Sequence, residues 1–432
     1  MRRRGARSAQ VVLAGVTALL VALAWIITYR LTTGPLHLDW TVALNALPTL
    51  VLIVVLVAAT WPRTFEHLPV APGRVAVIVP CYQESLAAVV RTVDSLLAGT
   101  VVPDLIYLID DGSTDPIDIT RLPTRIRFDR RVKIFRQANG GKREAQARAL
   151  YELRWHRDRG RPLADYILTV DSDCDLAPTA LRTLLRAMSE PSVQAATGLP
   201  LTRNRTASWL TRLIDLEISS ICLTYRTARS RLGGSLTTCS GALAIYRADV
   251  VLDNLADYLE GAVAAGDDRR LTHYALLRGQ VVSVPEALVY TDMPVTLRAL
   301  YRQRVRWSSS HWAYTGWEIA HLPTGPMLWT AFNLLVSIII PIGLVWLLIL
   351  APVLGYGLGW QAIAYWLVLS WTSSLGYAVR RPGLPAVTRW LTWLVGVPGL
   401  MLLQLVCIRP AMLAALREVR STSWHTRGAD AT

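Results

Sequence analysis

Uncharged apolar runs stand near both ends of the chain, and a charged segment lies between them. Residues 11–29 and 41–60 contain no charged side chain, and each run is long enough to cross a hydrocarbon core about 30 Å thick. Three further apolar blocks follow the central segment, at 327–351, 361–379 and 387–408. This pattern predicts a multi-pass membrane protein with a water-soluble domain inserted between its membrane helices.

The basic residues predict how the chain is oriented. Arginines precede the first apolar run, whereas the loop 31–39 contains no Lys or Arg. The positive-inside rule then places the N-terminus and the region after Trp61 in the cytoplasm. A cleaved signal peptide is the alternative for the first run, but that run is too long and a second span follows it at once. We therefore expect a plasma-membrane protein whose central domain is cytoplasmic.

The central segment alternates between strand and helix patterns. Short β-branched runs at 75–80, 105–110, 132–135 and 165–170 are separated by helical apolar spacing at 86–99 and by a Gly-rich start of a helix at 140–153. This alternation predicts an α/β domain, with a parallel sheet covered by helices on both faces. Ligands of such sheets bind at the carboxyl ends of the strands.

Acidic side chains follow two of these predicted strands. They belong to "DDGSTD" after 105–110 and to "VDSDCDLAP" after 165–170. Clustered carboxylates raise one another's pKa, and a bound cation relieves the repulsion. Oxygen ligands without a nearby His favour Mg²⁺ or Mn²⁺ over zinc. Solvated loop acids are the alternative interpretation of either cluster alone.

The net charge of +14 raises the question of a nucleic-acid partner. Cytoplasmic flanks of membrane spans are basic as a rule and contact anionic lipid, and no nucleic-acid-binding motif accompanies the charge. We therefore expect membrane lipid and no nucleic acid among the partners. The five cysteines have no CxxC spacing, which indicates buried thiols rather than disulfides or zinc ligands.

Seven motifs occur in a particular order: "PCYQE", "DDGSTD", "GGKR", "DSDCD", "CSGALAIYR", "GDDRRLT" and "RQRVRW". This order resembles that of the processive family-2 glycosyltransferases, most closely the hyaluronan synthases and the related enzymes that make chitin oligosaccharides. The resemblance implies a GT-A fold with a Rossmann-like mixed sheet, a UDP-sugar donor, and a polymer threaded through the protein's own membrane helices. The implied organisation is two membrane helices in 1–62, the GT-A domain in 63–293, interface helices in 294–325, membrane helices in 326–416 and a cytosolic gating-loop-like tail in 417–432.

The resemblance also implies roles for residues around the donor. Asp173 would hold the metal ion on the diphosphate, with Asp171 nearby. The uridine-binding edge and the nucleotide side of the pocket would consist of Tyr82, Glu84, Asp110, Asp111 and Lys142. Glu84 could instead cap the helix that begins near Ser85.

The "GDDRRLT" motif would supply the catalytic base. Asp268 matches the family's general base, Asp267 is the alternative, and Arg269 is expected to orient the two by charge pairing. Two aspartates at the start of a helix could also merely cap it.

Two further motifs would contact the sugars. The small residues Ser240 and Gly241, preceded by Cys239, would form a wall for the donor sugar or the acceptor, although a plain strand is the competing interpretation. In the QxxRW-type motif, a helix places Gln303 and Trp307 on one face, so that the indole can meet the acceptor while Arg306 reaches the diphosphate. Hyaluronan synthases usually have a second Gln at the position of Arg304. The same basic and aromatic helix also suits a membrane interface.

The C-terminal "WHTR" resembles the family's WGTR gating loop, with His425 in place of Gly. Trp424, Thr426 and Arg427 match, and Arg427 would bind diphosphate. An ordinary basic tail is the alternative. Because three simple spans after the domain would leave this loop outside the cell, we expect the last apolar block to break at 397–399.

Together these features predict an inverting, processive β-glycosyltransferase that uses GlcNAc, with or without GlcA, and passes the growing polysaccharide outward. A chitin-like oligosaccharide synthase and a non-processive transferase that loads a lipid carrier are the alternatives. A channel that senses nucleotide is disfavoured because the spans are almost uncharged. The sequence predicts no particular oligomeric state.

Overall fold

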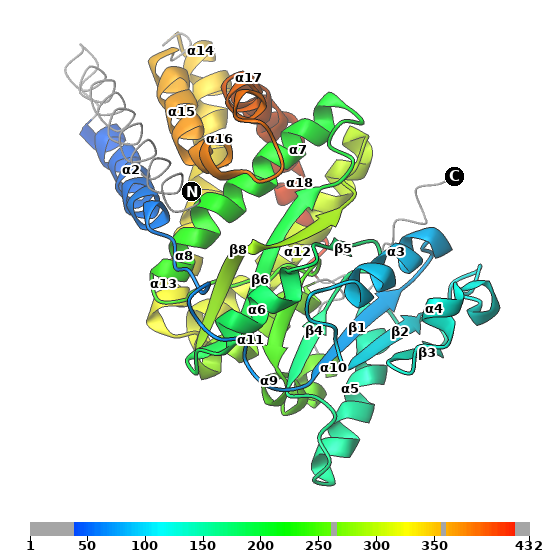
Figure 1. The fold of residues 1–432 in the computed structure, drawn as a ribbon. Helices are drawn as coiled ribbons and strands as arrows, with labels where there is room; N and C mark the ends of the chain where they lie inside the picture. Colours follow the sequence, from blue (N-terminus) through cyan, green and yellow to red (C-terminus); the bar gives the residue numbers. More distant parts are fainter. Residues whose placement is uncertain (1–38, 261–265, 356–359, 420–432) are drawn as a thin grey trace.

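The computed structural model describes residues 39–260, 266–355 and 360–419. Within them, eight strands form a single sheet in the order β3-β2-β1-β4-β7-β6-β8-β5 (Figure 1). The strands are β1 (Val75–Cys81), β2 (Leu105–Asp110), β3 (Val132–Arg136), β4 (Tyr166–Thr169), β5 (Asp175–Leu176), β6 (Val193–Thr202), β7 (Ala244–Arg247) and β8 (Gln280–Thr291).

The sheet is parallel in one half and mixed in the other. β3, β2, β1 and β4 are parallel neighbours, which confirms the alternation predicted for this part of the chain. β7 is antiparallel to β4 and to β6, whereas β8 is parallel to β6 and antiparallel to β5. A wholly parallel sheet was therefore wrong, and the observed GT-A-like mixed sheet is the one that the family resemblance implied.

The alternation of side chains along β1 builds a core on each face of the sheet. Val77 and Val79 belong to a core that includes α3 (Leu86–Leu97) and α6 (Ala180–Met188). Ile78 belongs to the opposite core, which is covered by α5 (Lys142–Asp158), α9 (Ala248–Leu252), α10 (Leu255–Glu260) and α11 (Asp267–Arg278). The short η1 (Ile119–Arg121) and α4 (Thr124–Arg127) lie between β2 and β3. Because β1, β2 and β4 end at the same edge, the loops that follow them meet there.

Two helical segments lie between the sheet and the apolar helices. The first runs through α7 (Trp209–Ser220), the π-helical η2 (Ile221–Arg226) and α8 (Thr227–Arg231), and it begins at a capping box made by Ser208 and Thr211. α7 packs against β6 and also against an apolar helix, α17 (Ala386–Leu403). The second is α12 (Leu297–His321), whose first turn is capped by the Thr296 side chain.

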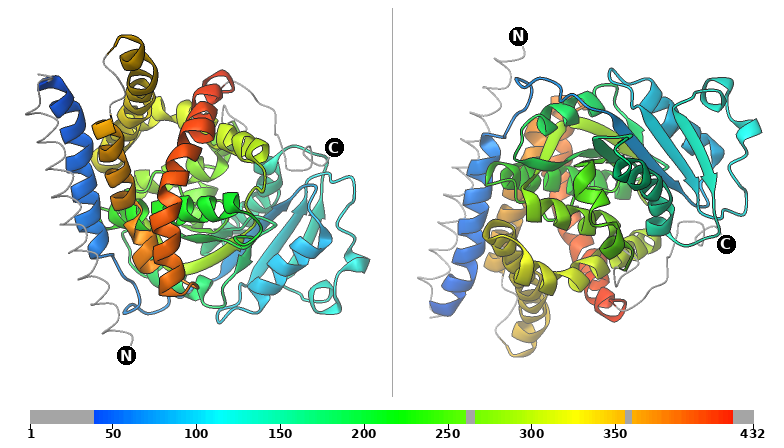
Figure 2. Two further views of the ribbon diagram at one scale, coloured as in Figure 1. Left: turned by 90° about the horizontal axis from the view of Figure 1, so that it is seen from above. Right: turned by 90° about the horizontal axis from the view of Figure 1, so that it is seen from below.

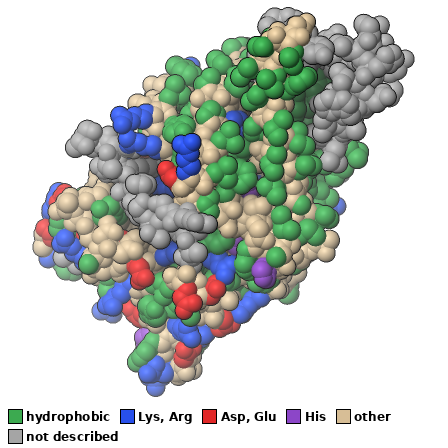
Figure 3. All heavy atoms as spheres, turned by 180° about the vertical axis from the view of Figure 1, so that it is seen from behind, with side chains coloured by type: hydrophobic (Ala, Val, Ile, Leu, Met, Phe, Trp, Pro, Cys, Tyr) green, Lys and Arg blue, Asp and Glu red, His purple; other side chains and the backbone are tan. Residues whose placement is uncertain are grey.

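The apolar helices gather on one side of the molecule, away from α3 and α4 (Figure 2). Besides α17, they are α2 (Asp39–Thr60), α13 (Thr324–Val345), η3 (Trp346–Leu350), α14 (Ala351–Val353), α15 (Trp360–Ser373), α16 (Leu375–Arg380), η4 (Gln404–Ile408), α18 (Arg409–Ala414) and η5 (Ala415–Arg417). Hydrophobic side chains dominate their surface, whereas charged side chains gather on the sheet domain (Figure 3). Among the described residues, two helices are long and apolar enough to cross a membrane, Thr324–Gly343 and Ala386–Arg417.

The predicted break at Val397, Pro398 and Gly399 was wrong. Pro398 lies inside α17, and the helical run continues to Arg417. A proline cannot donate to the carbonyl four residues before it, here that of Leu394. The indole Nε1 of Trp371 donates to that carbonyl instead, at 3.1 Å, so the helix continues without an unpaired acceptor. The predicted hairpin is therefore absent from residues 386–417, and it gives no support to a cytoplasmic C-terminus.

Candidate active site

Most of the predicted site residues meet in one cavity of about 450 Å³, beyond the carboxyl ends of β1, β2 and β4. They come from segments far apart in the sequence, which supports reading the motifs as parts of a single site. The predicted residues that line the cavity are Tyr82, Glu84, Asp111, Lys142, Asp171, Asp173, Cys239, Ser240, Gly241, Asp267, Asp268, Gln303, Arg306 and Trp307.

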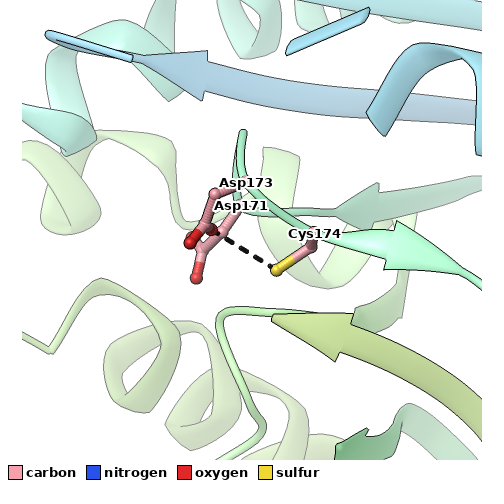
Figure 4. Close-up of side chains that lie close together, drawn as sticks. All are labelled: Asp171, Asp173 and Cys174. Carbon is pink, nitrogen blue, oxygen red and sulfur yellow. Dashed lines mark hydrogen bonds between the residues drawn. The ribbon is translucent and has the colours of Figure 1, made fainter. Parts of the chain in front are cut away.

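The loop after β4 brings three possible metal ligands together. One ligand atom each from Asp171, Asp173 and Cys174 lies within 4.8 Å of the others (Figure 4). Burial raises the pKa of the Cys174 thiol well above its ordinary value, so the thiol keeps its proton and is a poor ligand. The two carboxylates remain, and this oxygen donor set suits Mg²⁺ or Mn²⁺. The residues present therefore fit the expected cation.

Lys142 connects the acids of two motifs. It is the first residue of α5, and its Nζ lies 2.8 Å from Asp171 Oδ1 and 3.0 Å from Asp267 Oδ2. Burial acts to lower the pKa of Lys142, but the three neighbouring aspartates outweigh it and hold the pKa well above the ordinary value. The ammonium is therefore charged and ties the "DSD" loop to the "GDD" helix.

The adjacent Asp267 and Asp268 differ in their environments. Burial opposes ionisation of Asp267, but the charge and hydrogen bond of Lys142 lower its pKa below the ordinary value. Asp267 Oδ2 also accepts from Gln146 Nε2 at 3.3 Å. For Asp268, burial and the Asp267 charge raise the pKa to about 6. At neutral pH both are ionised, and Asp268 is the stronger base.

The Arg269 guanidinium forms its ion pair elsewhere, so the expected charge pairing with these aspartates was wrong, although the Arg269 backbone N–H donates to Asp268 Oδ1 at 2.7 Å. Its Nε lies 3.2 Å from Glu318 Oε1 on α12 and donates to Thr238 Oγ1 at 3.0 Å. Glu318 is buried and also contacts His273 Nε2 at 2.8 Å. Lys142, rather than Arg269, is the cation that pairs with Asp267. Arg269 instead connects α11 to α12 through Glu318.

Asp110 and Asp111 have different surroundings. Asp110 is buried outside the cavity lining, and its two carboxylate oxygens accept from the backbone N–H groups of Ser113 and Ile117. Asp110 therefore stabilises its own loop, which differs from the expected nucleotide contact. Asp111 lines the cavity and accepts from the N–H groups of Gly140 and Gly141, at 3.1 and 2.8 Å.

The "PCYQE" loop lies beside this edge. Gln83 has a left-handed backbone (φ 54°), and its N–H donates to Ser113 Oγ at 3.0 Å, which joins the loop to "DDGSTD". Ser85, rather than Glu84, caps α3, because its side chain accepts from the N–H of Ala88. Glu84 and Tyr82 line the cavity.

The sugar-side motifs form the rest of the lining. Gly241 lies so close to the ion pair that an added Cβ would come within 3.2 Å of Lys142 Nζ and 3.4 Å of Asp171 Oδ2. The N–H groups of Cys239 and Ser240 donate to Thr272 and Thr197, both at 2.9 Å. On α12, Gln303 is buried, whereas residue Trp307 is 43% exposed.

Comparison with known proteins then places the chain in a family. The model of the family described as glycosyltransferase like family 2 matches residues 72–310, more than half of the chain. The chain belongs to the family-2 glycosyltransferases. It is therefore an enzyme, a hexosyltransferase.

Its relatives include a hyaluronan synthase and an N-acetylglucosaminyltransferase. The glycosyltransferase is 32% identical over 367 residues to hyaluronan synthase of Streptococcus pyogenes, over 82% of this chain and 83% of that protein. It is 35% identical over 289 residues to an N-acetylglucosaminyltransferase of Sinorhizobium fredii, over 65% and 66% of the two chains. A solved mannosyltransferase from Pyrobaculum calidifontis, in complex with GDP-Man and Mn²⁺, matches with a TM-score of 0.48 and 16% identity over 96% and 98% of the chains.

Two residues of the candidate site were not predicted from the sequence. Thr291, at the end of β8, donates to Asp173 Oδ2 at 3.3 Å, and Gln146 contacts Asp267. Neither belongs to a motif, and only the tertiary fold brings them to the acids. The predicted Trp424 and Arg427 lie outside the described residues.

Proposed function

We propose that this glycosyltransferase polymerises sugars from UDP-sugar donors, with inversion, and passes the polysaccharide across the plasma membrane. GlcNAc, with or without GlcA, is the proposed donor set. The observation that carries the proposal is the Lys142 bridge, because it joins Asp171, a candidate metal ligand, to Asp267, the neighbour of the candidate base Asp268, in one cavity that Trp307 also lines.

The nucleotide end of the cavity is assigned to the loops after β1 and β2. Tyr82, Glu84 and Asp111 would bind the uridine, while Lys142 and Arg306 would meet the diphosphate as cations. Asp110 would support this end indirectly, through the loop that its carboxylate holds.

The metal is assigned to Asp171 and Asp173. They would hold Mg²⁺ or Mn²⁺, which when bound supplies positive charge to the diphosphate leaving group. Thr291 and Lys142 orient the two carboxylates, each through one oxygen.

Asp268 is assigned as the general base. Its carboxylate would take the proton of an acceptor hydroxyl as that oxygen bonds to the donor's anomeric carbon and the bond from this carbon to the diphosphate breaks, releasing UDP. Attack from the face opposite the diphosphate inverts the α-linked donor to a β-linkage. Asp267 is held by Lys142 and Gln146, which favours Asp268 over Asp267 for this role.

The acceptor would lie between two surfaces. Cys239, Ser240 and Gly241 would form the wall beside the donor sugar, where the absence of a Cβ at Gly241 leaves room next to Lys142. The Trp307 ring would stack on the acceptor, with Gln303 of the same helix facing the cavity.

The apolar helices are assigned the role of spanning the membrane. The proposed organisation has membrane helices in 1–62 and 326–416. The catalytic domain lies between them in 63–293, followed by the interface helices in 294–325. Exposed apolar side chains on α13 and on α17, such as Ile342 and Val395, support lipid contact. Residues 417–432 would close over the nucleotide through Trp424 and Arg427, which requires that an even number of spans in 326–416 returns them to the cytoplasmic side.

A chitin-like oligosaccharide synthase is the second candidate, favoured by the 35% identity to an N-acetylglucosaminyltransferase. A transferase that loads a lipid carrier would instead add a single sugar.

The experiment that distinguishes these functions uses purified protein in lipid vesicles. The protein is given UDP-GlcNAc, UDP-GlcA and UDP-Glc, singly and in pairs, and the size of the radiolabelled product is measured. Polymer only from UDP-GlcNAc with UDP-GlcA supports a hyaluronan-type product. Polymer from UDP-GlcNAc alone supports the chitin type, and single-sugar transfer to lipid rejects polymerisation.

A further inference from the structure

Arg304, the departure from the usual motif of hyaluronan synthases, lies against Trp307. Its guanidinium carbon lies over the indole, 4.4 Å from the ring centroid. The two residues are three apart on α12, so a helix brings their side chains together. Both line the cavity.

A buried acid holds this arginine. Arg304 NH2 lies 2.5 Å from Glu217 Oε2 on α7, and both side chains are more than nine-tenths buried. The second carboxylate oxygen, Glu217 Oε1, accepts from Gln404 Nε2 of η4 at 3.2 Å. Glu217 is thus fixed from two sides, and it fixes Arg304 in turn.

Stability alone does not explain this arrangement. A buried ion pair repays its desolvation only when its geometry is good and its remaining polar atoms are bonded. Arg304 Nε is buried and has no hydrogen-bond partner among the described residues. A neutral pair of similar size would fill the same space with a smaller desolvation free energy. The contact of the planar guanidinium with the indole ring therefore needs an explanation other than stability.

We propose that Arg304, held by Glu217, is a positioning residue that sets the orientation of the Trp307 ring for the acceptor sugar. A sugar stacks on one face of an aromatic ring, so a ring that turns away loses the acceptor. The guanidinium covers the ring from one side, which limits its rotation and leaves the other face for the sugar. This proposal rests on the proposed polymerising function.

The test uses full-length protein in lipid vesicles and three measurements: the polymer formed, the free sugar released when the donor's sugar is transferred to water and UDP leaves, and the Kd for UDP. Arg304→Lys retains the charge for Glu217 but lacks the planar group. The double variant Glu217→Gln with Arg304→Gln removes both charges together. Arg298→Gln, which changes an exposed arginine on the same helix, is the matched control.

Polymer should fall about tenfold in Arg304→Lys and in the double variant, because both lack the stacked guanidinium. Release of free sugar and the Kd for UDP should remain near the wild-type values in these variants, and Arg298→Gln should behave as wild type.

Wild-type polymer from Arg304→Lys or from the double variant would overturn the proposal, because the pair would then serve stability alone. Loss of UDP affinity in parallel with polymer would also overturn it. Wild-type protein that elongates nothing rejects the proposed function instead, so the two failures are distinguishable.

Discussion

The Lys142 ammonium lies 3.0 Å from Asp267 Oδ2 and joins the start of α5 to the start of α11. This contact lowers the pKa of Asp267, whereas burial, together with the Asp267 charge, raises the pKa of its neighbour Asp268. The two adjacent carboxyl groups therefore differ, because Lys142 pairs directly with Asp267 while burial dominates at Asp268. Asp267 serves as a fixed anion, and Asp268 as a group that can exchange a proton near neutral pH.

Asp268→Asn should slow the chemical step and preserve binding. The amide keeps the shape of the side chain but cannot accept the proton, so elongation should fall by about 10²- to 10⁴-fold. The Kd for UDP should stay near that of the wild type. Calorimetry of UDP and radiolabelled polymer, measured on the same preparations, test both statements.

Asp111→Asn and Trp307→Ala are the matched comparisons. Asp111→Asn should weaken UDP binding, because its carboxylate holds the N–H groups of the Gly140–Gly141 turn. Trp307→Ala should bind UDP and lose polymer. If Asp268→Asn loses UDP as severely as Asp111→Asn, the "GDD" motif belongs to the nucleotide site and Asp267 becomes the first candidate base.

The pH dependence should follow Asp268. A protonated carboxyl cannot act as a base, so the elongation rate at saturating donor should fall as the pH decreases through about 6 and should level off above it. The charge of Lys142 lowers the pKa of Asp268, so Lys142→Met should move the midpoint to higher pH. Lys133→Met is the control, because Lys133 pairs with Glu152, outside the cavity lining. An unchanged or lower midpoint in Lys142→Met contradicts the assignment.

Metal removal should stop the reaction. Activity should vanish with EDTA and return with Mg²⁺ or Mn²⁺, and Asp173→Asn should remain inactive with either ion because it lacks a charged ligand. Asp175→Asn is the control from the same acidic stretch, since Asp175 pairs with Arg203 at 2.7 Å and lies outside the cavity lining. It should keep its metal dependence. Full turnover by Asp173→Asn, or by the wild type in EDTA, excludes this metal site.

The edge of the sheet that carries the site could be predicted from local patterns. The runs at 75–80, 105–110 and 165–170 alternate with helices, and parallel strands end at one edge, so the acids that follow them had to lie near one another. The order of the motifs then predicted that "GDDRRLT" and "RQRVRW", which lie on α11 and α12, belong to the same site.

Other contacts could not be predicted, because their partners lie far apart in the sequence and outside every motif. The partner of Arg269 is Glu318, on a different helix and outside every motif, so charge spacing near Arg269 pointed to the wrong acids. Pro398 indicated a break because a proline leaves a carbonyl unpaired, but the Trp371 indole that pairs with this carbonyl comes from α15. Both errors arose where tertiary packing overrides a local rule.

Gly241→Ala should separate the geometry of the site from the stability of the fold. An added Cβ would lie 3.2 Å from Lys142 Nζ and 3.4 Å from Asp171 Oδ2, so the ion pair must shift, and misplacing such groups can cost up to about 10²-fold in rate. The melting temperature should be unchanged or slightly higher, since replacing Gly by Ala reduces the entropy of the unfolded chain. Gly316→Ala on α12 is the control, because its Cβ would meet no atom within 4 Å other than those of its own helical turns, and this variant should leave turnover unchanged. Turnover and thermal unfolding, measured on both variants, test this prediction.

Two outcomes would contradict it. Wild-type turnover in Gly241→Ala would show that the spacing of Lys142 and Asp171 is not critical for catalysis. A large drop in the melting temperature would show that Gly241 is needed for the stability of the fold.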